Sequence, residues 1–424
     1  MKQNFKICGE KDIRLVPYSP VQETDNLEIR CQIYNESTEA EEVKLSFCFD
    51  GVEINRQTLF VESKSYGLAV CRHSMKGKAG RHKISVNGEL VDLEVVKKSP
   101  TLLNGGFIMF GPPNDRDGCD LFRDDLKNMT DSDWENYVDE LSKMGADCVI
   151  ITACAQYLCF MPESGEDYKI VAHYPSKIYP KSDIVADDPI DAVLRTAEKN
   201  GMKVFIAVGN NYGHAGTIEE LCELFERYNK YKSFYGWYFS LELNMESFSE
   251  EQWNRLAELT KAARRLSPVM PILTSPYRLP SEEFLEYVRR NDIFDIIMPQ
   301  DWVGQKRLTL SESDMMHRRL LESAESVGKH LWGNCESFNF SSVFNKGVDN
   351  GGHLVPRFRD GGMDGEAGFI QQMQTVRPYV EKIMNFMFSG FFTPTGFVPK
   401  IGGEAAVKQY EDYMKYYKEQ TKNN

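Results

Sequence analysis

Three acidic residues stand at or near the carboxyl ends of apolar runs. Glu242 ends FYGWYFSLE, Asp301 ends IFDIIMPQD, and Glu336 lies near the end of HLWGNCESF. Burying a carboxylate without a compensating partner costs free energy, so three acids at such positions indicate a functional role rather than chance. Two carboxyls about 5–5.5 Å apart can serve as nucleophile and general acid/base at a glycosidic bond, whereas a gap of about 6.5–9.5 Å admits a water molecule. Glu242, Asp301 and Glu336 are therefore the predicted catalytic residues.

Each acid also has a structural explanation. It could cap the helix that follows its strand, or pair with a basic side chain inside the fold. Asp301 is the acid for which we most expect such a pair, and Glu246 is expected to be a solvated residue at a helix entry. The basic residues that could neutralise an acid lie in or near the same loops: Arg278, Lys306, Arg307, Arg357 and Arg359.

Polar and aromatic residues gather around the same positions. Sugar hydroxyls bind amide and hydroxyl groups, and the apolar face of a pyranose ring stacks on an aromatic plane. Trp302 follows Asp301 directly and is the aromatic residue that we favour for stacking. The Asn and Gly residues of GNNYGH have an alternative explanation, because both types are favoured in turns. The predicted substrate-binding residues are Tyr157, Asn210, Asn211, Tyr212, Gln300, Trp302, Asn334 and Phe338.

Strand alternation limits which of these side chains can share a face. Successive side chains of a strand point to opposite faces, so Glu336 shares its face with Asn334 and Trp332. Only one of Gln300 and Asp301 can point the same way, and both are kept as candidates.

Apolar runs that alternate with amphipathic helix patterns must position these residues. This alternation is typical of βα units around a parallel sheet, and eight strand–helix pairs predict a (βα)8 barrel. One helix is expected to begin at an N-cap, Asp131, and another carries Pro189 in its first turn. The connections after the first, second and seventh apolar runs are longer than a barrel needs, and they lie on the face where barrel active sites form. The runs are 105–110, 147–152, 203–209, 234–242, 270–276, 293–301, 330–338 and 382–390.

The first part of the chain has a different pattern. Short alternating segments such as VKLSFCFDG, separated by polar or Gly-containing turns, predict a β-sandwich of immunoglobulin type. We therefore predict an N-terminal sandwich over residues 1–98 and a barrel over residues 99–424. The sandwich has no cluster of His, Asp or Glu for chemistry, so we expect a packing or spacer role, with carbohydrate binding as the alternative.

Charge and composition limit the class of binding partner. The 424 residues carry a formal net charge of −13 with a pI near 5.2, which repels nucleic-acid phosphates and anionic lipid surfaces. A neutral partner fits best. No stretch is long and apolar enough to cross a bilayer, so we expect no membrane insertion.

Cysteine and histidine usage bears on compartment and cofactors. The ten cysteines are scattered without CxxC pairs, which favours reduced thiols and a cytoplasmic location. The start shows no secretory signal, but a trimmed chain would look the same, and its location would then be secreted or periplasmic. None of the seven histidines forms an H-x-H or H-E-x-x-H pattern, so we expect no histidine-built metal site and no cofactor. Residues 346–352, KGVDNGG, are interpreted as a flexible lid.

Three ordered motifs carry a family resemblance. GWYFSLE (236–242), MPQDWVG (298–304) and LWGNCESF (331–338) resemble those of an uncharacterised bacterial family of glycoside-hydrolase-like TIM barrels. In the wider glycosidase clan with this layout, the strand 4 Glu is usually the acid/base and the strand 7 Glu the nucleophile. The resemblance therefore implies these roles for Glu242 and Glu336. One departure is Leu241, which stands where that clan normally has Asn.

These observations together predict a retaining glycoside hydrolase that cleaves an oligo- or polysaccharide without a cofactor. Asp301 and Asn210 are expected to hold sugar hydroxyls, and an Asp301 acid or base acting with a water would instead imply inversion. Two alternatives stay open: a carbohydrate-binding barrel without catalysis, and a metal-dependent hydrolase that uses the carboxylates. The sequence does not indicate an oligomeric state.

Overall fold

The structure is a computed structural model, which describes residues 7, 9–111, 123–157, 170–209, 216–240, 244–305, 307–341, 353–356 and 368–422. The chain divides into two compact units. The first comprises Met1–Pro100 with Ala257–Pro271, and the second comprises Thr101–Leu256 with Ile272–Asn424. The boundary predicted at residue 98 stays a prediction.

Two β-sheets form most of the first unit, after a short helix, α1 (Gly9–Asp12). One sheet has the antiparallel order β1–β3–β6, and the other has the order β2–β8–β7–β4–β5, in which only the β2–β8 pair is parallel. The strands are β1 (Ile13–Val16), β2 (Val21–Gln22), β3 (Asn26–Tyr34), β4 (Glu41–Phe49), β5 (Val52–Val61), β6 (Tyr66–Ser74), β7 (Gly80–Val86) and β8 (Glu89–Val96).

Alternating side chains give this unit its core. In β4, Val43, Leu45 and Phe47 are buried, and Lys44, which lies between Val43 and Leu45, is exposed, as expected of a strand with one face in the core. Apolar residues from both sheets, including Ile29 of β3 and Phe47 of β4, belong to one buried cluster. The all-β character predicted for the N-terminal region is confirmed.

A parallel sheet of nine strands forms the centre of the second unit. Each of the eight predicted apolar runs contains a strand of this sheet. Their order is β17–β16–β15–β14–β13–β10–β9–β21–β18. The strands are β9 (Gly105–Ile108), β10 (Cys148–Ile151), β13 (Lys203–Val208), β14 (Phe234–Phe239), β15 (Ile272–Thr274), β16 (Ile296–Ile297), β17 (His330–Leu331), β18 (Gly333–Glu336) and β21 (Ile383–Phe386).

The two ends of this sheet are consecutive pieces of chain. β17 pairs with β16, β18 pairs with β21, and Trp332 alone separates them. The Trp332 N–H donates to the Ile297 carbonyl at 3.0 Å, so the segment 330–336 contacts both borders. The sheet is therefore a nearly closed parallel barrel, as predicted, while the exact count of eight βα units stays a prediction.

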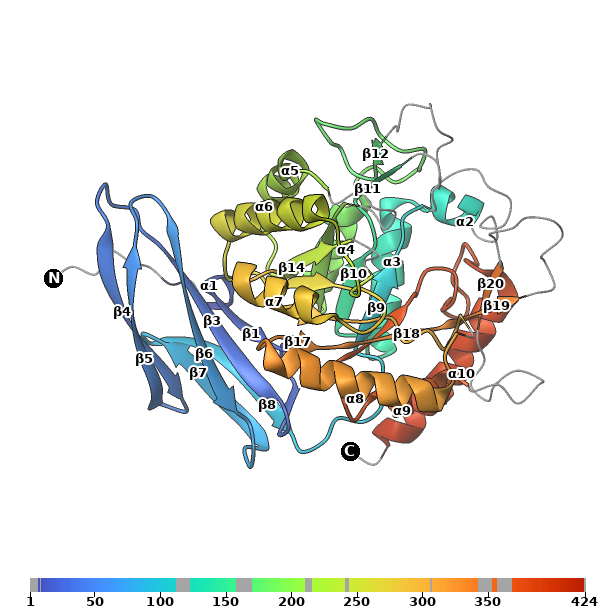
Figure 1. The fold of residues 1–424 in the computed structure, drawn as a ribbon. Coiled ribbons are helices and arrows are strands. Elements are labelled where there is room, and N and C mark those ends of the chain that lie inside the picture. The colour runs from blue at the N-terminus through green and yellow to red at the C-terminus, as the bar shows by residue number, and fades with distance from the viewer. Residues whose placement is uncertain are drawn as a thin grey trace. The chain divides into compact units, whose positions relative to one another are not determined.

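Helices lie around these strands, as Figure 1 shows. Most of them follow amphipathic segments, and α3, α4, α5, α7 and α8 begin at Thr, Asp or Ser caps whose side chains accept a backbone N–H. The structure corrects one cap: Thr130, not Asp131, caps its helix, because the Thr130 hydroxyl accepts from the Asp133 N–H and the Asp133 carboxylate accepts from the Thr130 N–H. The helices are α2 (Arg123–Asn128), α3 (Asp131–Lys143), α4 (Pro189–Lys199), α5 (Ile218–Tyr228), α6 (Glu250–Leu266), α7 (Glu282–Asn291), α8 (Leu310–Ser326), α9 (Phe369–Val376) and α10 (Gly403–Thr421).

Two long βα connections contain further strands. β11 (Ala155–Tyr157) pairs with β12 (Ile170–Ala172), and β19 (Phe338–Ser341) pairs with β20 (His353–Pro356), both antiparallel. These hairpins lie in connections where only loops were expected. The predicted lid, 346–352, lies outside the described residues.

Among the described residues, no helix combines the length and apolar character that a membrane span requires. The same part of the chain holds no group of three or more His, Cys, Asp or Glu side chains that could bind a metal ion.

Candidate functional site

Aromatic contacts show which side chains point into the barrel. The Phe107 ring of β9 lies 5.2 Å from the ring of Tyr238 in β14, and the Phe205 ring of β13 lies 5.7 Å from that of Trp332. Neither pair comes from neighbouring strands, so both contacts cross the interior. Because alternate residues share a face, Glu336 points inward with Trp332, in agreement with the alternation expected from the sequence.

Glu336 ends β18 with only 1 % of its surface exposed. Gln305, in the connection after β16, holds both carboxylate oxygens. Its backbone N–H donates to Oε2 at 2.7 Å and its side-chain Nε2 donates to Oε1 at 2.9 Å. Hydrogen bonds donated to a carboxylate favour its charged form. Glu336 is thus a buried acid whose orientation is fixed by two hydrogen bonds from Gln305.

Gly304 explains how this connection comes so close to Glu336. A Cβ at Gly304 would lie 2.3 Å from the Phe338 carbonyl oxygen and 2.6 Å from the Glu336 Cβ. Only glycine leaves room for the chain to pass here, so the glycine of the MPQDWVG motif permits the contact between Gln305 and Glu336.

Asp301 is fully buried and its carboxylate contacts α9 and the backbone of β18. The Glu336 N–H donates to its Oδ1 at 3.2 Å, and the Gln372 side chain of α9 donates to its Oδ2. Gln372 also donates to the Glu336 carbonyl at 3.2 Å. Asp301 and Gln372 therefore fix the backbone that carries Glu336.

Asn334 and Gln300 lie beside each other on neighbouring strand segments, joined by an isolated parallel bridge. Asn334 is buried, and its Nδ2 donates to the Ser275 hydroxyl at 2.9 Å. Its Oδ1 has no hydrogen-bond partner within the described part of the chain. A buried polar atom without a partner is costly, so Asn334 offers an acceptor two residues before Glu336.

Trp302 has neighbours that sequence reasoning did not anticipate. Its ring stacks on Tyr277 with centroids 5.6 Å apart, and the guanidinium carbons of Arg307 and Arg278 lie 5.3 and 5.9 Å from its centroid. The side chain is half-buried, and its backbone has a positive φ of 57°. The ring is thus partly occupied by neighbours of this chain.

The remaining predicted residues divide into two groups. Phe338 is only 4 % exposed and packs against Phe386 and Phe391, with centroids 6.2 and 5.8 Å away, which does not favour stacking with a ligand. Other predictions lie outside the described residues, so the pairing of Glu242 with Glu336 stays a prediction. These are Glu242, Asn210, Asn211, Tyr212, the side chain of Tyr157 and the basic residues Lys306, Arg357 and Arg359.

Sequence reasoning missed another buried acid, Glu220, in the first turn of α5. Burial raises its pKa from 4.5 to about 7. The Gly209 N–H, at the carboxyl end of β13, donates to it at 3.2 Å, and the Tyr179 hydroxyl donates at 3.4 Å. An acid near a helix start normally caps or faces water, so the sequence carries no signal for this burial.

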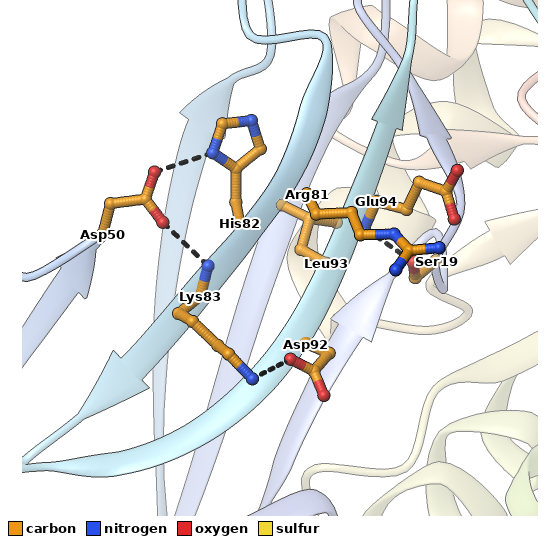
Figure 2. Close-up of a pocket in the computed structure, with 8 residues that line it drawn as sticks. All are labelled: Ser19, Asp50, Arg81, His82, Lys83, Asp92, Leu93 and Glu94. Atoms are coloured by element: carbon orange, nitrogen blue, oxygen red, sulfur yellow. Dashed lines mark hydrogen bonds and ion pairs between the residues drawn. The ribbon is translucent and has the colours of Figure 1, made fainter.

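A hollow of about 500 Å³ lies in the first unit, over β7 and β8 (Figure 2). His82 Nδ1 lies 2.7 Å from Asp50 Oδ2, and the Lys83 N–H donates to Asp50 Oδ1 at 2.8 Å. The Lys83 ammonium pairs with Asp92, which is 81 % exposed. These charged groups pair with each other in contact with water, so the hollow lacks the buried acid that distinguishes the barrel.

Comparison with known proteins identifies the family of this chain. A protein-family model described as a domain of unknown function, DUF4434, matches residues 103–397. The chain belongs to the DUF4434 family. The match spans β9 to β21, so the resemblance inferred from the three motifs is confirmed. No curated protein sequence matches this DUF4434 protein.

Solved structures resemble the DUF4434 protein at low identity. A protein from Bacteroides thetaiotaomicron, provisionally described as an alpha-L-fucosidase, aligns with a TM-score of 0.52 and 19 % identity over 75 % of this chain and 95 % of its own. Two beta-glucuronidases from Bacteroides uniformis align with TM-scores of 0.43 and 0.41 at 12 and 13 % identity, over 97 and 96 % of this chain. This chain covers 50 and 49 % of those two proteins, about half their length. The first of these likenesses shows a shared fold.

Proposed function

We propose that this DUF4434 protein is a glycoside hydrolase built on a (βα)8 barrel. The observation that carries the proposal is Glu336, a buried acid at the carboxyl end of a barrel strand, with both oxygens held by Gln305. Active sites of barrel enzymes lie at this end of the strands. The enzyme names of the structural neighbours are consistent with this function, but a shared fold alone serves many reactions, so the argument rests on the site.

In the proposed reaction, Glu336 attacks the anomeric carbon as an ionised nucleophile. Glu242 protonates the leaving oxygen and then activates water, which gives retention of configuration. The two N–H groups of Gln305 hold the nucleophile in place, and the Asn334 Oδ1 accepts a bond from a sugar hydroxyl. Asp301 acts through its contact with the Glu336 backbone and does not need to touch the sugar.

The test is a comparison of Glu336→Gln with Glu325→Gln, which removes an exposed carboxylate from α8. Both are assayed on a panel of aryl glycosides and polysaccharides. We expect Glu336→Gln to lose turnover while it still binds the substrate, and Glu325→Gln to match the wild type. Unchanged turnover in Glu336→Gln would show that Glu336 is not the nucleophile and would refute this mechanism.

A non-catalytic carbohydrate-binding barrel is the second candidate. Asn334 Oδ1 would accept a hydrogen bond from a sugar hydroxyl in either candidate. The contacts of the Trp302 ring with Tyr277 and two arginines do not distinguish an enzyme from a binding protein. The two are separated by the same assay, because a binding protein shows affinity for sugars and no turnover before or after substitution of Glu336.

A further inference from the structure

Two arginines contact the ring of Trp302, the residue that follows Asp301. The guanidinium carbons of Arg307 and Arg278 approach its ring at 5.3 and 5.9 Å, which are cation–π distances. A cation–π contact positions a guanidinium without neutralising its charge. Trp302 therefore acts as a support for two positive charges, a role different from the sugar stacking expected from sequence.

The charges of these two arginines are available to a ligand. Arg278 pairs with Glu246 at 2.7 Å, but the two side chains are 46 and 52 % exposed, and such surface pairs exchange readily with water. Arg307 is exposed, and across the ranges that the structure describes no carboxylate pairs with it. Arg307 is thus the stronger candidate to bind an anion.

The segment that carries Arg307 is tied to Glu336 through Gln305. Gln305, two residues earlier, donates two hydrogen bonds to the Glu336 carboxylate, and the Arg307 N–H donates to the Trp302 carbonyl at 3.1 Å. The turn is therefore fixed at both ends. Trp302 and Arg278 both have left-handed backbones, with φ of 57° and 69°, and such strained positions are typical of ligand-binding sites.

We propose that Arg307, assisted by Arg278, forms an anion subsite for the carboxylate or sulfate group of an acidic saccharide. The planar guanidinium fork matches the oxygens of either group. A chain with a net charge of −13 repels anions at long range, so an acidic ligand requires a local concentration of positive charge such as this one. The saccharide part of the inference rests on the proposed function, and the acidic part departs from the neutral partner predicted from overall charge.

The experiment measures binding by isothermal titration calorimetry with three probes: trigalacturonic acid, a galactose trisaccharide carrying sulfate esters, and neutral galactotriose. We expect at least one acidic probe to bind about tenfold tighter than the neutral one. Whichever acidic probe binds identifies the group as carboxylate or sulfate. Added salt should weaken the binding of that probe only.

Matched variants locate the effect. Arg307→Ala should reduce affinity for the acidic probe about tenfold and leave the neutral probe unchanged. Arg290→Ala removes the same charge from α7, where the side chain is 74 % exposed, and should behave as the wild type. Equal affinity for acidic and neutral probes, equal losses in the two variants, or no binding of either acidic probe would overturn the subsite.

Hydrolysis of the glycoside panel is measured separately, so the two proposals can fail independently. Tight, Arg307-dependent binding of an acidic probe without hydrolysis of any glycoside would refute the hydrolase and keep the subsite. Hydrolysis with no preference for charged probes would do the reverse.

Discussion

Gln372 of α9 offers the sharpest test of the contacts behind Glu336. Its side chain is fully buried and donates to the Asp301 carboxylate and, at 3.2 Å, to the Glu336 carbonyl. Methionine has a similar length and volume but no N–H group. Gln372→Met therefore removes both donated bonds while leaving the space filled.

The expected cost follows from the two bonds that are lost. A hydrogen bond to a charged acceptor contributes about 1.5–3 kcal/mol, and one to a neutral carbonyl about 1 kcal/mol. We expect Gln372→Met to lower the free energy of unfolding of the second unit by about 3 kcal/mol. Gln374→Met makes the same replacement at an exposed position of α9 and should change it by less than about 0.5 kcal/mol.

Tryptophan fluorescence in urea is a suitable assay, because all five tryptophans belong to the second unit: Trp134, Trp237, Trp253, Trp302 and Trp332. Its transition therefore reports this unit without interference from the first. The free energies are compared at equal m-values. Equal midpoints for Gln372→Met and Gln374→Met would refute the reasoning, since the buried amide would then contribute no net stability.

Three further outcomes follow from the same structure. Gly304→Ala places a Cβ 2.3 Å from the Phe338 carbonyl oxygen, so we expect a loss of about 1–3 kcal/mol in the same urea assay; wild-type stability would contradict the close approach. Burial raises the pKa of Glu220 to about 7, so the folded state retains a proton that the unfolded state releases, and stability falls as pH rises from about 4.5 to above 7. Glu220→Gln lacks this loss and should exceed the wild type by about 3 kcal/mol at pH 8 and by little at pH 4, whereas parallel pH profiles would argue against a buried protonated acid. Burial lowers the pKa of His317 from 6.5 to about 4, so stability is lost as pH falls below 6.5, and His317→Gln should flatten that part of the urea-measured profile; an unchanged profile would mean that His317 does not remain neutral.

Much of the fold could be predicted because its elements have local signals. The apolar runs and the amphipathic helix patterns located the elements, because burial of a strand and of one helix face both leave a periodic signal, but the strands are shorter than the runs: β16 covers only Ile296–Ile297 of the run 293–301. The helix cap at Thr130 was misplaced by one residue because Thr and Asp both serve as caps, and only the reciprocal bonds with Asp133 decide between them.

The contacts of the candidate site carried a weaker signal. Glu336 could be recognised because a carboxylate is unusual at the end of an apolar strand. Gln305 and Gln372 could not, because glutamine in a loop or on a helix is ordinary, and what distinguishes them is tertiary contact with Glu336 and Asp301. The partners of Trp302 were likewise invisible, since Tyr277 comes from the neighbouring strand connection.

The break at Trp332 affects the order in which the barrel strands can pair during synthesis. His330–Leu331 pairs with β16, which is already synthesised, and Asn334 bridges to Gln300 before it, whereas the partner strand that aligns with all of Gly333–Glu336 is β21, whose last residue, Phe386, lies fifty positions later. Gln372, which fixes the Glu336 backbone, also emerges after it. A nascent chain that ends between these points should hold an incomplete ring, in which the Glu336 carboxylate can meet Gln305 but its backbone lacks β21 and Gln372, so the barrel closes only after its final strand has emerged.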